Sequence, residues 1–542
     1  MKTRHKLIWV LLGAAAVQAQ TIEYDVVIRN GRVLDGNGNP WIRADVAIKD
    51  GRFARIGKVG GQGRREIDAA GKYVSPGWID MLDQSGEALL QSGLAESKLR
   101  MGVTTGISGE GGTVVAAEKL PEYFAQLEKN GISMNFGTYY NEAQARVEVL
   151  RYVARAPTAE ELTRMQGLLE TAMKNGALGM TTALIYPPSS YATTAELIEM
   201  AKVAAKYGGI YATHMRGEGA ELLQSIQEAI TIGETGGLPV EIFHLKAAYQ
   251  PGWGKLMVQA GRLIDQARAR GVDVAADMYL YTAGGTGLEA VIPSWAHEGG
   301  GEELVKRLAD PEIRARLKKE MQTGSPGWWN VVEASGGWDH IVLASSSNEE
   351  DARLVGKSIA AIATEKGRDP ADTAFDLVAR SKTRVSAIYF MMSDADIETA
   401  VKFPWVSLGS DAEAVNPKPG APPELEHPRT FGNFPRLIAR YVRDQHVITL
   451  EDAIRKMTSW PATRLRLPNR GSIKEGMWAD AVIFDLARIQ DRATFQEPTL
   501  PPEGIDYVLV NGQVVIDQGK HTEAKPGQIL YGPGWRSPHV EK

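Results

Sequence analysis

Short apolar runs alternate with longer amphipathic segments from residue 76 to residue 460. Consecutive examples are the apolar runs 177–185, 209–214 and 240–246, with the helix-like segments 194–207 and 220–235 between them. This alternation is typical of strands that pair in parallel, because each crossover needs a connection of about helix length. An alternation of this extent favours an α/β fold of the (β/α)8 TIM-barrel type over a doubly wound sheet. We therefore expect residues 76–460 to form a TIM-barrel domain.

Both ends of the chain contain short strand patterns joined by tight turns. Residues 24–30 and 45–56 alternate apolar and polar side chains, and residues 507–517 contain a further hairpin pattern around Asn511-Gly512. Turns of this composition favour antiparallel pairing of the strands beside them. Since the two ends share the pattern, we expect residues 20–75 and 461–542 to build one small β-sandwich domain.

One segment interrupts the alternation, from residue 284 to residue 338. It contains three consecutive glycines at 299–301, a charged helix-like stretch at 303–321, and Trp328-Trp329. Loops that follow barrel strands are where barrel proteins build their pockets. We expect this segment to be an insertion over the barrel mouth, and the alternative is an ordinary long excursion.

The first 19 residues have the pattern of a signal peptide. Lys2 and Arg4 precede the apolar run 7–17, and Val17 and Ala19 occupy positions −3 and −1 of a cut after residue 19. No other stretch approaches the roughly 20 apolar residues of a membrane span. We expect export to the periplasm or the medium, with no membrane span in the mature chain. The alternative is an uncleaved membrane anchor.

The composition restricts the partners and the metal ligands. The formal net charge is only −5 over 542 residues, and both signs are spread along the chain. Without a basic stripe there is no argument for nucleic-acid binding, so we expect a small-molecule partner. The chain has no cysteine, which excludes disulfides and thiolate ligands. Any metal must be held by histidine, by carboxylate or by a modified lysine.

Two histidines and a glutamate end strand-like runs and form a candidate metal site. His214 ends the run 209–214, His244 lies in the next run along the chain, and Glu110 follows a strand-like segment at 102–108. Because parallel barrel strands all end at one face, these side chains are expected to converge there. Two imidazoles and a carboxylate suit zinc and leave a position for water. The alternatives are structural histidines and an exposed loop glutamate.

A further carboxylate, Asp411, follows the apolar run 406–408 at the boundary where a strand would end. An acidic group beside a metal-activated water can accept its proton and pass it on, which is general acid and base chemistry. The alternative is an aspartate that only shapes a turn.

With these residues the chain resembles the amidohydrolase superfamily, and within it the N-acyl-D-amino-acid deacylases, also called D-aminoacylases. The resemblance runs over the whole mature chain and rests on the segments 25–35, 76–80, 102–112, 176–186, 212–218, 244–248, 277–288, 409–411, 427–436 and 457–485.

The resemblance implies a zinc-dependent amidohydrolase that acts on C–N bonds other than ordinary peptide bonds, cleaving the amide of an N-acylated D-amino acid in the barrel domain. By position, His214 and His244 match metal ligands and Asp411 matches the catalytic acid/base. The substrate-binding groups match Lys246, Tyr281, Arg429 and, as a further candidate, Arg216. Cations there suit a substrate carboxylate.

Two departures from the family pattern concern the metal. The family's His-x-His after the first strand is replaced by Leu82-Asp83-Gln84, and the position of its cysteine ligand falls at Gly111. Leucine cannot ligate a metal and glutamine is a poor substitute. The resemblance therefore implies one zinc ion, held by Glu110, His214 and His244.

Two other functions stay open at the level of the sequence. A barrel that has lost its chemistry would be a non-catalytic pseudoenzyme that binds a carboxylate ligand. A catalyst with a different pocket would hydrolyse a cyclic amide or a dipeptide.

Overall fold

The computed structural model describes residues 22–381, 385–416 and 425–536. The expected signal peptide, residues 1–19, lies outside the described residues. The centre of the fold is a ring of short parallel strands: β6 (Trp78–Asp80), β7 (Val103–Ser108), β8 (Asn135–Thr138) continued by β9 (Tyr140–Asn141), β10 (Gly179–Ala183), β11 (Ile210–His214), β12 (Val240–Ile242), β13 (Val274–Met278) and β17 (Val406–Leu408).

Hydrogen bonds close this ring. Strands β6, β7 and β8 pair in parallel, and a second parallel run follows the order β9, β10, β11, β12, β13 and β17. The last strand returns to the first, because the Met81 amide donates to the Leu408 carbonyl at 3.1 Å. The predicted (β/α)8 barrel is confirmed, with β8 and β9 together counting as one of its strands.

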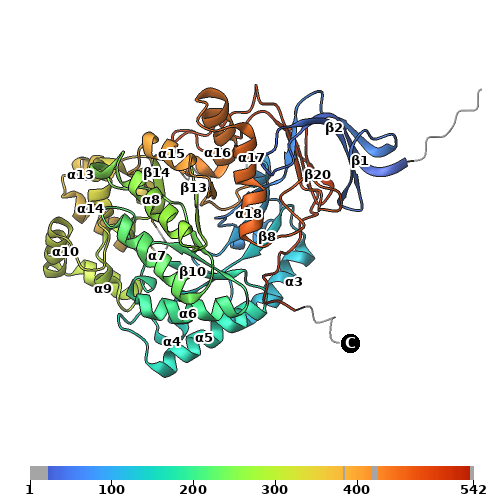
Figure 1. Ribbon diagram of the computed structural model, residues 1–542. Helices are drawn as coiled ribbons and strands as arrows, with labels where there is room; N and C mark the ends of the chain where they lie inside the picture. The colour runs from blue at the N-terminus through green and yellow to red at the C-terminus, as the bar shows by residue number, and fades with distance from the viewer. Residues whose placement is uncertain (1–21, 382–384, 417–424, 537–542) are drawn as a thin grey trace, which may run out of the picture.

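The barrel helices turn one apolar face to the strands. In α6 (Thr194–Lys206) the buried residues include Leu197, Met200, Ala201 and Ala204, spaced three or four apart as a one-sided helix requires. The helices of this layer are α3 (Leu120–Asn130), α4 (Glu142–Leu150), α5 (Ala159–Lys174), α6, α7 (Leu222–Gly236), α8 (Leu256–Ala269), α15 (Asp394–Val401), α17 (Leu450–Met457) and α18 (Ser459–Arg464). Figure 1 shows α5, α6, α7 and α8 along the outside of the ring.

The two chain ends meet in one nine-stranded sheet. It contains β1 (Ile22–Val33), β2 (Ile42–Lys49), β3 (Arg52–Gly57), β4 (Gln62–Asp68), β5 (Tyr73–Pro76), β18 (Ala481–Phe484), β19 (Ile505–Val510), β20 (Gln513–Asp517) and β21 (Lys520–His521). Antiparallel pairing of β5 with β18 joins the N-terminal and C-terminal parts of this sheet. The boundaries at residues 75 and 461 stay predictions.

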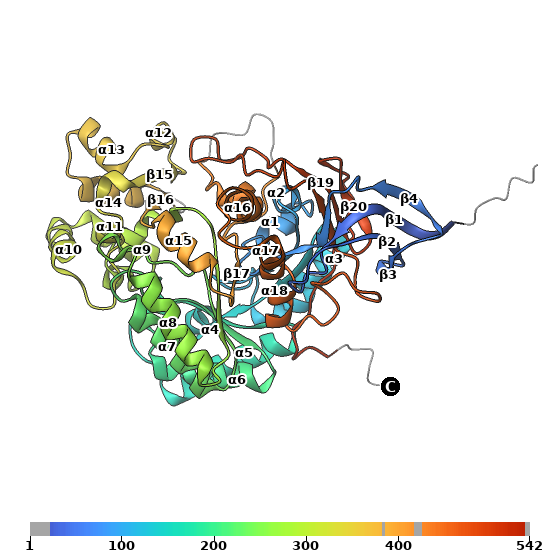
Figure 2. The ribbon, with the colours of Figure 1, turned by 45° about the horizontal axis from the view of Figure 1, so that its top comes forward.

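A separate lobe extends from the barrel between β13 and α15. Its antiparallel sheet has the order β14 (Ala283–Gly287), β16 (Ser386–Phe390), β15 (Ile341–Ser345). Its helices are α9 (Gly301–Ala309), α10 (Pro311–Thr323), α11 (Val331–Ala334), α12 (Glu349–Ala352), α13 (Ile359–Lys366) and α14 (Pro370–Arg380). The segment 284–338, expected as an insertion, therefore forms only the first part of this lobe, which continues to β16. The lobe and the nine-stranded sheet lie at opposite ends of the molecule (Figures 1 and 2).

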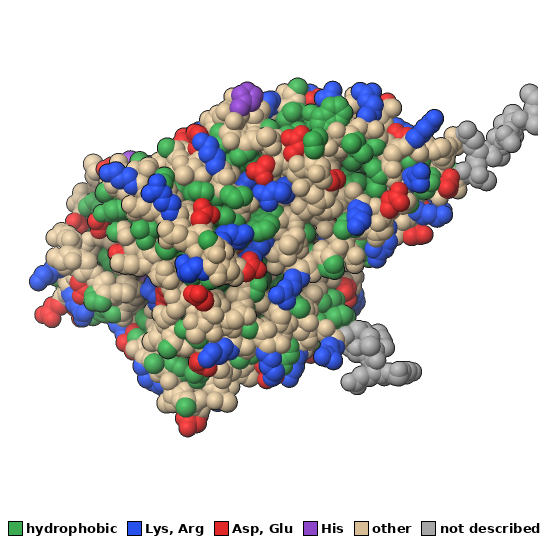
Figure 3. Space-filling view, viewed as in Figure 1, with side chains coloured by type: hydrophobic (Ala, Val, Ile, Leu, Met, Phe, Trp, Pro, Cys, Tyr) green, Lys and Arg blue, Asp and Glu red, His purple; other side chains and the backbone are tan. Residues whose placement is uncertain are grey.

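The face of the molecule in Figure 3 carries basic and acidic side chains intermixed. Within the described ranges, no helix combines the length and the apolar content that a membrane crossing requires.

A buried lysine connects the first and last strands of the ring. Lys98, in α2 (Glu96–Arg100), is fully buried, and its Nζ lies 2.9 Å from Asp80 Oδ2 and 2.8 Å from Asp83 Oδ1. The same ammonium donates to Ser410 Oγ at 2.7 Å and to the Ala412 carbonyl at 2.6 Å. One cation therefore connects the end of β6 to the segment that follows β17.

We predict that Lys98→Met lowers the free energy of unfolding by about 3–5 kcal/mol, because it leaves two buried carboxylates without their cation. Urea unfolding measures the change. The matched control is Lys119→Met, since Lys119 is 59% exposed in its ion pair with Glu122 and exposed pairs contribute little. Equal stability of the Lys98 variant and the wild type would contradict this role.

Candidate metal centre and active site

A cavity of about 620 Å³ opens at the carboxyl ends of the barrel strands and is bounded on its other side by the lobe. The barrel contributes Gln84, Glu110, His214, His244, Lys246 and Asp411, and the lobe contributes residues from β14, β15 and β16 together with Trp329. Barrel enzymes place their chemistry at this face, because every strand delivers a side chain to it.

Glu110, His214 and His244 converge in this cavity. Glu110 Oε1 lies 2.8 Å from His214 Nδ1 and 3.0 Å from His244 Nε2, and one ligand atom from each residue lies within 4.8 Å of the other two. All three residues are buried. The structure thus brings together the three predicted metal ligands.

The backbone positions these side chains at strand ends. His214 is the last residue of β11, and His244 follows β12 by two residues. His244 and Asp411 have φ angles of 37° and 49°, a region that residues other than glycine rarely adopt. The His244 amide donates to the buried Asp277 Oδ1 at 2.8 Å and the Asp411 amide to the Leu82 carbonyl at 2.8 Å. Such strained conformations are concentrated at functional sites.

Charges are strongly coupled around the imidazoles. Burial opposes ionisation of Glu110, but hydrogen bonds from His214 and His244 outweigh it and hold the pKa of Glu110 well below its usual range. Burial and Lys246 oppose a charge on His244, but Glu218 and Glu110 raise the pKa of His244 to about 10. Negative charge therefore dominates beside the imidazoles, as a cation site requires.

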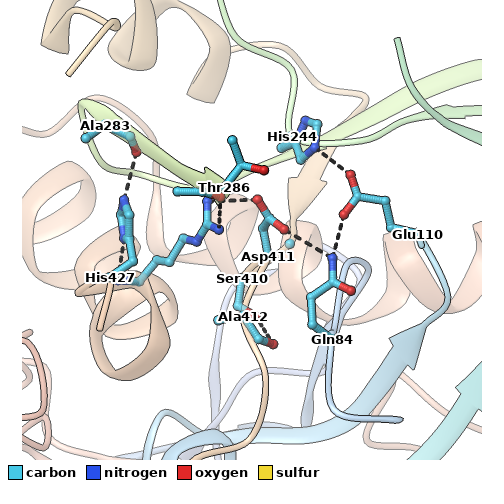
Figure 4. Close-up of polar contacts among 12 residues, drawn as sticks. Gln84, Glu110, His244, Ala283, Thr286, Ser410, Asp411, Ala412 and His427 are labelled. Carbon is cyan, nitrogen blue, oxygen red and sulfur yellow. Dashed lines mark hydrogen bonds and ion pairs between the residues drawn. The ribbon is translucent and has the colours of Figure 1, made fainter. Parts of the chain in front are cut away.

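Gln84 and Arg429 flank the predicted acid/base, Asp411. Gln84 Nε2 donates to Glu110 Oε2 at 2.5 Å and to Asp411 Oδ1 at 3.2 Å, so its amide lies between the two carboxylates (Figure 4). Arg429 Nη1 lies 2.8 Å from Asp411 Oδ2. In the sequence, Gln84 was noted only because it stands where the family pattern has a histidine. In the fold it contacts two carboxylates of the site.

Lys246 reaches the cavity but is engaged by a carboxylate that sequence reasoning missed. Its Nζ lies 2.6 Å from Glu218 Oε1 and 2.7 Å from His244 Nδ1. Glu218 is buried, and although burial opposes its charge, Lys246 and the two imidazoles lower its pKa. The only indication in the sequence that Glu218 belongs to the site was its position four residues after His214.

The other two predicted substrate-binding residues lie outside the cavity lining formed by the described residues. Arg216 is paired with Glu228 at 3.0 Å and donates to the carbonyls of Ser190 and Ala192. The buried ring of Tyr281 packs edge-on against His427, with ring centroids 5.6 Å apart. His427 does line the cavity, and it also lies close to Arg429 in the sequence.

The donor set fits a zinc ion. Two imidazole nitrogens and one carboxylate oxygen are ligands that zinc accepts, and such three-ligand sites keep a position for water. Their convergence on one buried point, with a carboxylate that stays ionised, matches that requirement.

Comparisons with known proteins agree with this site. A sequence model described as the Amidohydrolase family matches residues 65–516. An N-acyl-D-glutamate deacylase of Alcaligenes xylosoxydans xylosoxydans is 33% identical over 527 residues, covering 93% of this chain and 96% of its own length.

Two solved structures are similar over the same extent. An N-acyl-D-glutamate deacylase from Bordetella bronchiseptica, complexed with zinc and a phosphonate mimic of the tetrahedral intermediate, has a TM-score of 0.78 and 30% identity, covering 94% of this chain and all of its own. A D-aminoacylase structure has the same TM-score, identity and coverage. The work on that protein concerns its binuclear metal centre, in which one metal activates and the second attenuates.

We predict that protein produced with zinc retains the metal through purification, and that His244→Ala keeps less than about a tenth of the wild-type content, because two ligands bind zinc far more weakly than three. Elemental analysis measures this. The control is His340→Ala, which changes an exposed histidine of the lobe. Zinc-free wild-type protein, or equal zinc content in the His244 variant, would contradict the assignment.

Proposed function

Because this chain belongs to the Amidohydrolase family, we propose that it is a metal-dependent hydrolase that cleaves the amide bond of an N-acyl-D-amino acid. The observation that carries the proposal is the convergence of Glu110, His214 and His244 beside Asp411 in one cavity. The relatives named for N-acyl-D-glutamate deacylase and D-aminoacylase activity support the substrate class.

The reaction adds water to the carbonyl carbon and breaks the C–N bond, releasing a carboxylate and a free amino acid. Zinc bound at this site would polarise the carbonyl and lower the pKa of water towards about 7. Asp411 accepts the proton that the attacking water loses and returns it to the leaving nitrogen. Gln84 donates to Asp411 Oδ1 and so helps to hold the carboxylate in place.

Arg429 is the cation that we propose for binding the substrate carboxylate. It is buried beside the cavity and pairs with Asp411 through one nitrogen, and a guanidinium has five N–H donors. Lys246 stays a predicted substrate-binding residue, but its ammonium already lies 2.6 Å from Glu218. Its charge is therefore largely balanced within the protein.

We propose that the site holds one zinc ion. Leu82 is 1% exposed and belongs to an apolar cluster inside the barrel, so it offers no ligand. Gln84 directs its amide nitrogen, a donor, at both Glu110 and Asp411. A donor in this position stabilises the two carboxylates without a second cation.

We also propose that the enzyme is exported to the periplasm or the medium by cleavage after residue 19. The positive start, the short apolar run and the small residues before the cut support this. The intact mass of protein recovered from the periplasm tests it, and a chain that retains residues 1–19 would contradict it.

We predict that Asp411→Asn lowers kcat/KM on N-acetyl-D-amino acids by about 10²–10⁴-fold and leaves zinc content unchanged, because Asp411 moves protons and is not a ligand. Release of the free D-amino acid is the measurement, with the N-acetyl-L-amino acids run in parallel. The matched control is Asp444→Asn, which changes an aspartate that is 52% exposed. An unchanged rate would remove Asp411 from the mechanism. Zinc-loaded wild-type protein that binds these amides without hydrolysing them would favour a non-catalytic binder.

A further inference from the structure

Glu218 lies behind the two metal-binding imidazoles, on the side away from Glu110. Its Oε1 is 3.1 Å from His244 Nδ1, and its Oε2 is 3.7 Å from His214 Nε2. The nitrogens that face Glu110 are the opposite ones, His214 Nδ1 and His244 Nε2. We propose that Glu218 is a positioning residue that sets the tautomer of both imidazoles, so that their metal-facing nitrogens carry lone pairs. The proposal rests on the metal-dependent function proposed above.

The chemistry of imidazole makes a group of this kind necessary. A neutral imidazole carries one proton, and only its unprotonated nitrogen can ligate a metal. If His214 Nδ1 and His244 Nε2 ligate, the protons belong on His214 Nε2 and His244 Nδ1. An ionised carboxylate only accepts hydrogen bonds, so Glu218 stabilises that arrangement.

Lys246 opposes this tautomer at His244. Its ammonium lies 2.7 Å from His244 Nδ1 and can only donate, so a hydrogen bond to that nitrogen would place the imidazole proton on the metal-facing Nε2. Glu218 Oε1 lies within reach of both competing groups, at 2.6 Å from Lys246 Nζ and 3.1 Å from His244 Nδ1. A carboxylate that accepts from both groups can hold the His244 proton on Nδ1, even though the Lys246 contact with that nitrogen, at 2.7 Å, is the shorter one.

The second imidazole lies within electrostatic range of the same carboxylate. His214 Nε2 is buried and has no hydrogen-bond partner among the described residues. A buried donor without a partner is unfavourable. Glu218 Oε2 faces this nitrogen at 3.7 Å, which is longer than a hydrogen bond and leaves an electrostatic contact. The two oxygens of one carboxylate are thus directed at the distal nitrogens of two different histidines.

The backbone holds Glu218 at this position. Its carbonyl accepts from the Ala248 amide at 2.8 Å, and the neighbouring Gly217 amide donates to Ser225 Oγ at 3.0 Å. The first bond connects the loop after β11 with the loop after β12, which carries Lys246. A Cβ added at Gly219 would lie 2.5 Å from Trp329 Nε1, so the glycine allows this close packing. The fixed loop gives the carboxylate a defined direction.

A simpler role would be that Glu218 only neutralises Lys246. The two roles predict different results for a pair of variants. If neutralisation is the whole role, then Lys246→Met should restore zinc binding to a Glu218→Gln variant. If Glu218 sets the tautomers, the double variant should still bind zinc more weakly than the wild type, because removing Lys246 lifts its opposition at His244 but restores no carboxylate acceptor at either distal nitrogen.

The experiment measures the zinc Kd by chelator competition, with zinc itself as the probe. Glu218→Gln is expected to raise the Kd at least about tenfold, as loss of a group that orients a metal ligand does. Lys246→Met is expected to keep the wild-type Kd or to lower it. The matched control is Glu221→Gln, an exposed glutamate three residues along the chain.

Glu218→Asp keeps an acceptor-only carboxylate and the net charge, so it provides a conservative variant if Glu218→Gln does not fold. It is expected to bind zinc more weakly than the wild type and more tightly than Glu218→Gln. The visible absorption of the cobalt-substituted protein gives a second readout, expected to change in both Glu218 variants and to be retained in Lys246→Met.

Three results would overturn the inference alone: a Kd of Glu218→Gln or of Glu218→Asp equal to that of the wild type, or full rescue in the double variant. A wild-type chain that binds no zinc would overturn the proposed function and this inference with it.

Discussion

The closure of the strand ring is the constraint on which the rest of the structure depends. Every proposed ligand and acid/base group is delivered by the end of a barrel strand, so the groups meet only if the first strand lies beside the last. The Met81–Leu408 hydrogen bond and the buried Lys98, with Asp80 and Asp83 around it, hold that seam. Gln84 and Asp411 extend from its two sides and are in contact across it.

The same seam carries the departure from the family pattern. Leu82 turns into the apolar interior, Asp83 pairs with Lys98, and Gln84 alone reaches the cavity. In the proposed one-zinc site, two groups directed at Asp411 would stand in for the positive charge of a second metal: the amide of Gln84, which donates a hydrogen bond, and the guanidinium of Arg429, which forms an ion pair. The other cation, Lys246, is balanced by Glu218 behind the imidazoles. Each charged group thus has a partner within the site.

Sequence patterns predicted the features that depend on local periodicity. The barrel alternation was visible, and so were strand-end residues such as Glu110, His214 and His244, because strand ends mark one face of a barrel. The pairings of Glu218 and Gln84 could not be predicted, since each depends on which loops meet in space. The burial of Tyr281 behind the cavity wall could not be predicted either, because it also depends on which loops meet in space. The insertion expected from the sequence was shorter than the lobe. Strands β15 and β16 of the lobe alternate with helices, and this local pattern is the same as that of barrel units.

Titration of the metal-free protein with zinc, while the release of a D-amino acid from its N-acetyl derivative is followed, tests the one-zinc hydrolase directly. Activity is expected to rise in proportion to added zinc and to level off at one equivalent. Activity that persists in the metal-free protein, or that appears only with a second equivalent, would contradict a catalytic site built on one zinc ion.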